Sequence, residues 1–188
     1  MQGSKRYKAR ETEIEKTLTA RQKLQEIENY IIATDKQKIA IEKITENVIY
    51  GSKWLFIYGG PGTGKGHICT AIYKERLRSF KSAIYINAFD MFRELKLNYL
   101  KPEVLEKYYT TNTLIIDEIE KFAGTTKNDE KDYLFAIINR RYENYLQTII
   151  ISNATYGDVE RLLTAPILDR FSEMGGTINF DWPSHRSK

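Results

Sequence analysis

Residues 54–67 read WLFIYGGPGTGKGH, and this stretch decides the fold. An apolar run is followed directly by a glycine-rich loop in which Gly59, Gly64 and Lys65 fit the G-x-x-x-x-G-K frame, and a helical pattern begins after His67. Glycines allow positive φ and close backbone approach, so successive N–H groups can surround a phosphate while the lysine reaches the β- and γ-phosphates. The loop therefore predicts ATP binding. The expected nucleotide-binding residues are Gly59, Gly60, Pro61, Gly62, Thr63, Gly64, Lys65, Gly66 and His67.

The last position of this loop departs from the usual pattern. Gly66 stands where a Ser or Thr hydroxyl normally ligates Mg²⁺. Water can fill that coordination position, because Mg²⁺ commonly keeps several waters. We expect ATP and Mg²⁺ to bind, with hydrolysis that is slow or depends on a partner or on DNA. His67 fits packing or solvation on the first helical turn as well as nucleotide contact.

Four further apolar runs follow, separated by helical patterns. They are AIYIN at 83–87, TLIID at 113–117, TIIIS at 148–152 and TINF at 177–180. The helices are expected at about 65–80, 88–99, 130–146 and 156–171. Strands that are apolar throughout suit a parallel sheet covered on both faces. The sequence predicts a three-layer α/β/α fold with a five-stranded parallel sheet over residues 51–188, preceded by a short helical segment over 1–50.

Residues 10–33 are rich in Glu, Lys, Gln and Leu and predict an amphipathic helix. Its apolar stripe is expected to contain Ala20, Leu24, Ile27 and Ile31. Ile14 and Leu18 fall outside that stripe. Such a helix suits packing against the body of the protein, and it also suits docking on a partner.

A second helix is expected to begin with Asp35 as its N-cap and to end near Gly51. Ile41, Ile44 and Val48 recur at spacings of three and four along it. This helix would lead directly into the first strand.

The charge of the chain is weak. The formal net charge is +4, from 29 basic and 25 acidic residues, and Lys5, Arg6, Lys8 and Arg10 account for all of it. This balance argues against a dedicated binder of duplex DNA, although a neutral protein can still line one groove with cations.

The single cysteine, Cys69, excludes an internal disulfide, and no Cys/His cluster has the spacing of zinc ligands. The N-terminus has no apolar region behind its charges, and no stretch approaches the ~18 apolar residues of a membrane span. We expect a cytoplasmic protein with no membrane partner.

Three polar side chains follow the third and fourth apolar runs. Asp117 and Glu118 end TLIIDE, which places one carboxylate near Mg²⁺ and a second where a base can orient the attacking water. Asn153 ends TIIISN, and its amide can hold the same water. With Lys65, these residues predict a site for ATP hydrolysis.

Together these motifs resemble the AAA+ family that contains the DnaC-type helicase loaders and the IstB-type transposition helpers. The resemblance rests on GPGTGK followed by histidine, on LIIDE, on IINRRYE before IIISN, and on ILDRF followed by FDWPSHR. It implies that Arg170 is an arginine finger that reaches the nucleotide of a neighbouring subunit, and that Arg186 contacts nucleotide in its own subunit. A homo-oligomer formed with ATP is therefore expected. Arg140 and Arg141 suit a solvated helix face or a subunit boundary.

The resemblance also implies that single-stranded DNA is held by elements after the second strand, here AFDMFRELKLNYLK. Phe89, Arg93 and Lys96 are the candidate contacts, since aromatic rings stack on bases and cations meet phosphates. An amphipathic helix with core aromatics has the same composition, so both interpretations stay open.

The leading hypothesis is an ATPase that loads a hexameric replicative helicase onto single-stranded DNA. One alternative is a transposition helper of the same fold, which the short chain and modest charge make less favoured. Another is an adaptor that binds ATP as a switch with little hydrolysis, which Gly66 suggests.

Overall fold

The computed structural model describes residues 2–98, 101–124 and 128–186. Five strands form one parallel sheet in the order β2-β3-β4-β1-β5. Their bounds are β1 Leu55–Tyr58, β2 Ala83–Asn87, β3 Thr113–Asp117, β4 Gln147–Ile151 and β5 Thr177–Asn179. The five predicted strands are confirmed, and each end lies within one residue of its expected position.

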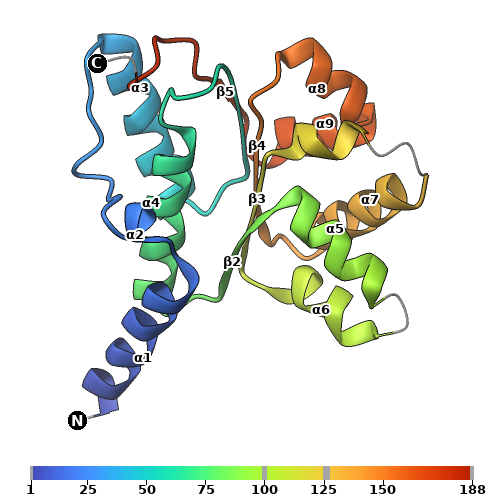
Figure 1. The fold of residues 1–188 in the computed structure, drawn as a ribbon, viewed down its shortest axis with the longest axis horizontal. Helices are drawn as coiled ribbons and strands as arrows, with labels where there is room; N and C mark the ends of the chain where they lie inside the picture. Colours follow the sequence, from blue (N-terminus) through green and yellow to red (C-terminus); the bar gives the residue numbers. More distant parts are fainter. Residues whose placement is uncertain (1, 99–100, 125–127, 187–188) are drawn as a thin grey trace.

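Helices cover both faces of the sheet, which confirms the predicted three-layer architecture (Figure 1). One layer contains α1 Gln2–Thr17, α2 Ala20–Lys23, α3 Asp35–Lys43 and α4 Lys65–Arg78. The other contains α5 Ala88–Leu97, α6 Pro102–Thr110, α7 Asn128–Glu143, α8 Tyr156–Leu162 and α9 Ala165–Met174. In the described residues, no helix combines the length and apolar character needed to span a membrane.

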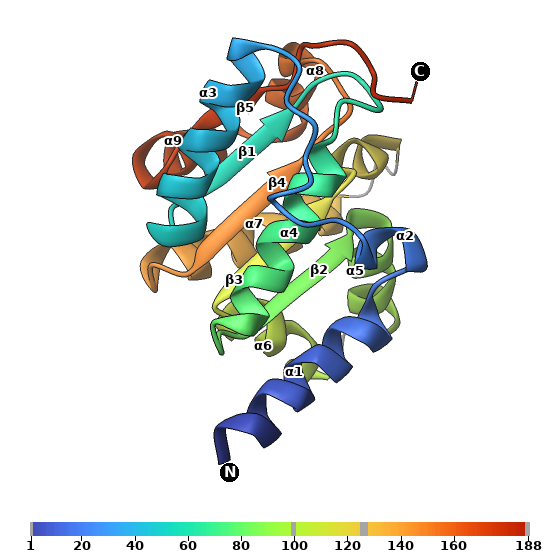
Figure 2. The same ribbon diagram turned by 90° about the vertical axis from the view of Figure 1, so that its left-hand side faces the viewer.

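The continuous apolar strands fill two cores, because successive side chains of a strand point to opposite faces. Ile57, Ile115 and Ile149 join the core under α4, whereas Phe56 and Ile150 join the core under α5, α7 and α9. Figure 2 shows α4 crossing one face of the sheet. A strand buried on both sides has no polar face, which explains its uniform pattern.

The expected single helix over 10–33 is wrong. α1 ends at Thr17, and Thr19 begins the short α2 through a capping box with Gln22. The expected stripe is wrong as well, since Ile14 and Leu18 are buried in the core with α4, whereas Leu24 is 75% exposed. Residues four apart share a helix face, so this pair anchors α1 on the body.

The other helices depart from expectation in a cap residue, in the division of one helix and in one additional helix. Thr34, not Asp35, caps α3, which continues as a π-helix over Ile44–Tyr50. The helix expected at 156–171 is two helices, because Pro166 lies in the first turn of α9 and cannot continue α8. α6 was not expected, because its short pattern follows α5 closely.

Arg141 lies in the interior, which corrects its placement on a solvated helix face or a subunit boundary. Its side chain is fully buried. The guanidinium donates to the carbonyls of Tyr108 (2.8 Å), Thr111 (2.9 Å) and Gln147, and to the hydroxyl of Thr148 (2.9 Å). Burial lowers the pKa of Arg141 to about 9, so it stays charged at neutral pH. One cation thus ties α7 to the end of α6 and to β4.

We predict that Arg141→Met lowers the free energy of unfolding by about 3 kcal/mol, because several buried acceptors lose their donor at once. Arg141→Lys should also destabilise the protein, since a lysine lacks the planar fork that reaches separate carbonyls. Urea denaturation measures both effects. The matched control is Arg140→Met at the neighbouring exposed position, expected within about 0.5 kcal/mol of the parent. Equal stabilities for the Arg141 and Arg140 variants would contradict this account.

Candidate active site

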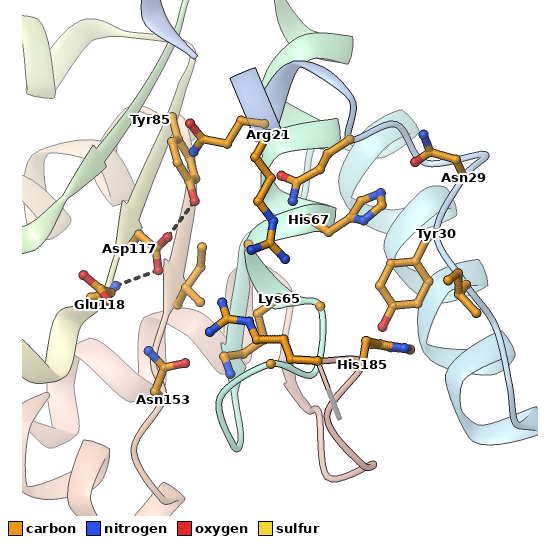
Figure 3. Close-up of a pocket in the computed structure, with 18 residues that line it drawn as sticks. Arg21, Asn29, Tyr30, Lys65, His67, Tyr85, Asp117, Glu118, Asn153 and His185 are labelled. Carbon is orange, nitrogen blue, oxygen red and sulfur yellow. Dashed lines mark hydrogen bonds between the residues drawn. The ribbon is translucent and has the colours of Figure 1, made fainter. Parts of the chain in front are cut away.

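The site lies where the carboxyl ends of the parallel strands meet. The phosphate loop follows β1, the acidic pair ends β3, and Asn153 follows β4, so that strand order alone brings them to one edge. They line a pocket of about 370 Å³ (Figure 3). The sequence-predicted residues that line it are Gly62, Gly64, Lys65, Gly66, His67, Asp117, Glu118, Asn153 and Arg186. Gly59, Gly60, Pro61 and Thr63 belong to the loop but do not line the pocket.

Two loop glycines are required by their surroundings. Gly59 has φ 135°, and a Cβ there would lie 2.3 Å from the carbonyl oxygen of Phe180. Gly64 has φ 95°, and a Cβ would lie 2.5 Å from the ring of Tyr30. These positions combine left-handed backbone with close packing, which only glycine tolerates.

The loop is held from behind at the carbonyl of Thr63 by two donors. The Thr63 oxygen accepts from the Tyr30 hydroxyl at 2.9 Å and from Trp182 Nε1 at 2.8 Å. Burial raises the pKa of Tyr30 to about 12, so the hydroxyl is a donor at neutral pH. In a trans peptide the next N–H points opposite to the carbonyl, so these two donors also fix the direction of the Gly64 N–H.

Lys65 begins α4 and is buried, with an exposed fraction of 4%. Its Nζ donates to the carbonyls of Gly59 and Gly60, both at 2.7 Å. Burial lowers the pKa of Lys65, while Glu120 and Asp117 act in the opposite direction. The ammonium therefore lies inside the loop, at the N-terminus of a helix, where a phosphate would meet it.

Both oxygens of Asp117 have donors. Oδ2 accepts from the Tyr85 hydroxyl at 2.6 Å, and Oδ1 accepts from the Glu118 N–H at 2.8 Å, as Figure 3 shows. Burial raises the pKa of Asp117, although these hydrogen bonds favour the charged form. Tyr85 was not expected here, because it lies within an apolar run whose sequence pattern gives no direction to its hydroxyl.

Glu118 has an unusual backbone. Its φ is 54°, in the left-handed region that non-glycine residues rarely adopt. The side-chain Oε2 accepts from the Asn87 amide at the end of β2 and pairs with Lys121 Nζ at 2.5 Å. The carboxylate is thus tied to two neighbours at the edge of the pocket.

Asn153 is similarly tied to an acid that sequence reasoning missed. Its amide donates to Glu120 Oε1 at 2.9 Å, and the Ser152 hydroxyl donates to Glu120 Oε2 at 3.0 Å. Glu120 lies just beyond the acidic pair in a 3-10 helix over Ile119–Gly124. The indication in the sequence that Glu120 could belong to the site was its position, three residues after Asp117.

The N-terminal segment forms one wall of the pocket, which sequence reasoning also missed. The lining residues from this segment are Arg21, Gln22, Gln25, Asn29, Tyr30 and Ile31. His67 Nε2 lies 2.8 Å from the carbonyl oxygen of Glu26, so His67 packs on this wall. Lys74, buried in α4, donates to the carbonyls of Lys23 (2.8 Å) and Gln25 (3.0 Å) and pairs with the Glu26 carboxylate. No spacing in the sequence relates these residues to the loop.

The two arginines implied by the resemblance lie in different places. Arg186 lines the pocket, whereas Arg170 on α9 does not. Arg170 donates to the Pro166 carbonyl at 3.0 Å and to the Asn139 side chain, and it lies over the rings of Phe135 and Tyr142. Its role as an arginine finger stays a prediction.

The candidate DNA contacts lie on α5, outside the pocket. Phe89 is exposed, and Arg93 lies over its ring at 5.9 Å and pairs with Asp90 at 3.1 Å. Phe92 is in the core. Lys96 belongs to the same helix. Contact of Phe89, Arg93 and Lys96 with DNA stays a prediction.

Known proteins are similar to this chain in sequence. DnaC of Escherichia coli (strain K12), a replicative helicase loader, is 29% identical over 171 residues, which are 86% of this chain and 69% of DnaC. The E. coli protein YdaV is 29% identical over 166 residues, 84% of this chain and 66% of YdaV. The chain therefore spans about two thirds of the length of these relatives.

Solved structures have the same architecture. A DnaI structure superimposes with a TM-score of 0.74 at 21% identity, over 90% of this chain and 95% of that one. AMPPCP-bound DnaA from Aquifex aeolicus has a TM-score of 0.72 at 24% identity, over 85% of this chain and 50% of that one. The model of the family described as IstB-like ATP binding protein matches residues 2–188. The chain belongs to this family of ATP-binding proteins.

Proposed function

We propose that the protein is a Mg²⁺-dependent AAA+ ATPase that helps place a replicative helicase on single-stranded DNA. The observation that carries the proposal is the pocket, which joins the phosphate loop, the acidic pair, Asn153 and Arg186 at one sheet edge. Family membership supports ATP as the ligand, and the likeness to DnaC supports the helicase as the partner.

The residues of the pocket suit ATP with Mg²⁺. The loop has no side chain at Gly62 and Gly64, where a Cβ would collide with Ser184 or Tyr30, so its backbone is open to a phosphate at these positions. Asp117 is the carboxylate that would hold the metal, and carboxylate oxygen is a preferred Mg²⁺ ligand. Bound with the nucleotide, Mg²⁺ would neutralise charge on the β- and γ-phosphates.

Each remaining residue has a defined part in hydrolysis. Lys65 would exchange its contacts with loop carbonyls for phosphate oxygens. Glu118 would accept a hydrogen bond from the attacking water, and Asn153 would orient that water. Glu118 is tied to Asn87 and Lys121, and Asn153 to Glu120. Hydrolysis would therefore be slow until binding of a partner or DNA exchanges these contacts.

Arg186 and Arg170 would act in different subunits. Arg186 lies in the pocket of its own chain, so it would contact the nucleotide there. Arg170 lies outside this pocket on α9, a position that supports a role toward the nucleotide of a neighbouring copy. Guanidinium groups give permanent charge and bidentate contacts to phosphate. The complete catalytic unit would then be a homo-oligomer with ATP at each boundary.

The helicase and DNA would meet other surfaces. Ile14 on α1 and Leu18 just after it are buried against the body, while Tyr7 on α1 is 48% exposed, so the outer face of this helix would be available to the helicase. On α5, the exposed ring of Phe89 beside Arg93 supports contact with single-stranded DNA.

Two alternatives follow from particular observations. The matching family model is that of IstB-like proteins, which favours a transposition helper acting on duplex DNA. The absence of a hydroxyl at Gly66 favours an adaptor that binds ATP with little hydrolysis. Duplex bending would identify the first, and no hydrolysis in a single turnover with partner and DNA would identify the second.

The helicase provides the first test. We predict that the purified protein with ATP forms a stable complex with the hexameric replicative helicase of its own source, as measured by light scattering behind a sizing column. Lys65→Ala is the comparison variant, since loss of the ammonium should remove nucleotide-dependent assembly. Absence of a complex with both ATP and ADP would contradict the loader function and favour one of the alternatives.

The assignment of Arg170 as an arginine finger predicts a specific defect in the rate of hydrolysis. Arg170→Ala and Arg170→Lys should bind ATP within about twofold of the parent but lose assembly-stimulated hydrolysis, because an arginine finger contributes about 10³-fold or more. Arg161→Ala, at an exposed arginine on α8, is the matched control and should retain stimulation. Equal stimulated rates in the Arg170 variants and the parent would refute the assignment.

We predict that the two donors to the Thr63 carbonyl, Tyr30 and Trp182, contribute cooperatively to ATP affinity. Tyr30→Phe and Trp182→Phe should each weaken binding about fivefold, because one hydrogen bond contributes about 1 kcal/mol. The double variant should lose more than the product of the two, since the buried carbonyl then has no donor. Calorimetric titration measures the affinities, and Tyr7→Phe at an exposed tyrosine is the control. Unchanged affinity in the double variant would show that the loop needs neither donor.

A further inference from the structure

A hydroxyl group lies beside the loop position that lacks one. Among the described residues, the first atom that a Cβ on Gly66 would meet is the Tyr85 hydroxyl oxygen, at 3.9 Å. A serine or threonine at position 66 would therefore place its Cβ in van der Waals contact with this oxygen. Because Gly66 has no side chain, the Tyr85 hydroxyl has no side-chain contact from this position.

Strand register directs Tyr85 to Asp117. Tyr85 pairs with Ile115 on β3, and Asp117 lies two residues further along the same strand. Residues two apart share a face of the sheet, and a long side chain reaches its diagonal neighbour on the adjacent strand. Ile115 belongs to the core under α4, so Tyr85 and Asp117 both face the N-terminal end of that helix.

The contact between the two side chains is short and specific. The Tyr85 hydroxyl donates to Asp117 Oδ2 at 2.6 Å, within the range of a charge-assisted hydrogen bond. Its ring packs near Tyr73, with the ring centroids 6.3 Å apart. The ring thus has a packing role, and the hydroxyl alone contacts the acid, so the two contributions can be separated by removing one oxygen.

We propose that Tyr85 compensates for the hydroxyl that the phosphate loop lacks, as a positioning residue that fixes Asp117 for the metal bound with the nucleotide. This inference rests on the proposed ATP and Mg²⁺ site. This hydroxyl comes from β2 instead of from α4, and it contacts the carboxylate that would hold the metal. The departure at Gly66 is then offset by a hydroxyl that acts on the carboxylate and not on the metal itself.

Four proteins test the proposal: the parent, Tyr85→Phe, Gly66→Ser and the double variant. Calorimetry gives the Kd of a non-hydrolysable ATP analogue in excess EDTA and in Mg²⁺, and the ratio of the two values is the Mg²⁺ gain. Tyr85→Phe should reduce this gain about tenfold or more, as loss of an outer-shell partner does, while the Kd in EDTA stays within about twofold. Thermal melting verifies that each variant folds.

Gly66→Ser should restore most of the gain when combined with Tyr85→Phe and add little in the parent, where Tyr85 already fixes Asp117. A Mg²⁺ gain in Tyr85→Phe equal to that of the parent would overturn the proposal. So would equal weakening in EDTA and Mg²⁺, which indicates packing alone, or a loss that Gly66→Ser does not restore. If the parent binds the analogue without any Mg²⁺ gain, the metal part of the proposed function fails too, whereas failure of Tyr85→Phe alone leaves that function intact.

Discussion

The carbonyl of Thr63 is the point on which the rest of the site depends. It accepts from Tyr30, in the segment before α3, and from Trp182, beyond β5, so the loop is held by residues far away on both sides in the sequence. Gly64 must remain glycine because the Tyr30 ring fills the space of its Cβ. A loop that binds phosphate through N–H groups needs those groups aimed before the ligand arrives, and this buried carbonyl aims one of them.

On the acidic side of the pocket, residues from the neighbouring strands or just beyond them hold each carboxylate at the end of β3 and in the segment after it. β2 provides Tyr85 for Asp117 and Asn87 for Glu118. The end of β4 provides Ser152 and Asn153 for Glu120. Because β3 lies between β2 and β4, its acids have donors on both sides. The strained backbone of Glu118 is maintained within this framework.

The sequence was sufficient for the sheet and the phosphate loop, because a buried parallel strand followed by glycines and a helix has few alternatives. It could not locate the break at Thr19, since helical periodicity continues past the capping box and the stripe through Leu24 fits as well as the pair Ile14 and Leu18. Arg141 could not be placed because two of its four acceptors, the carbonyls of Tyr108 and Thr111, lie at the end of α6, a helix that was not expected. Tyr85 could not be recognised because its contact depends on strand order.

The two donors on Thr63 also have a thermodynamic consequence. Linkage is reciprocal. If the ordered segments around Tyr30 and Trp182 stabilise a bound nucleotide, the bound nucleotide stabilises the order of those segments by the same free energy. Tyr30 lies before β1 and Trp182 lies after β5, so the two segments are at opposite ends of the part of the chain that forms the sheet. A bound nucleotide is thereby linked to the order of two parts of the chain that are remote in the sequence, through the carbonyls of Thr63 and Gly62.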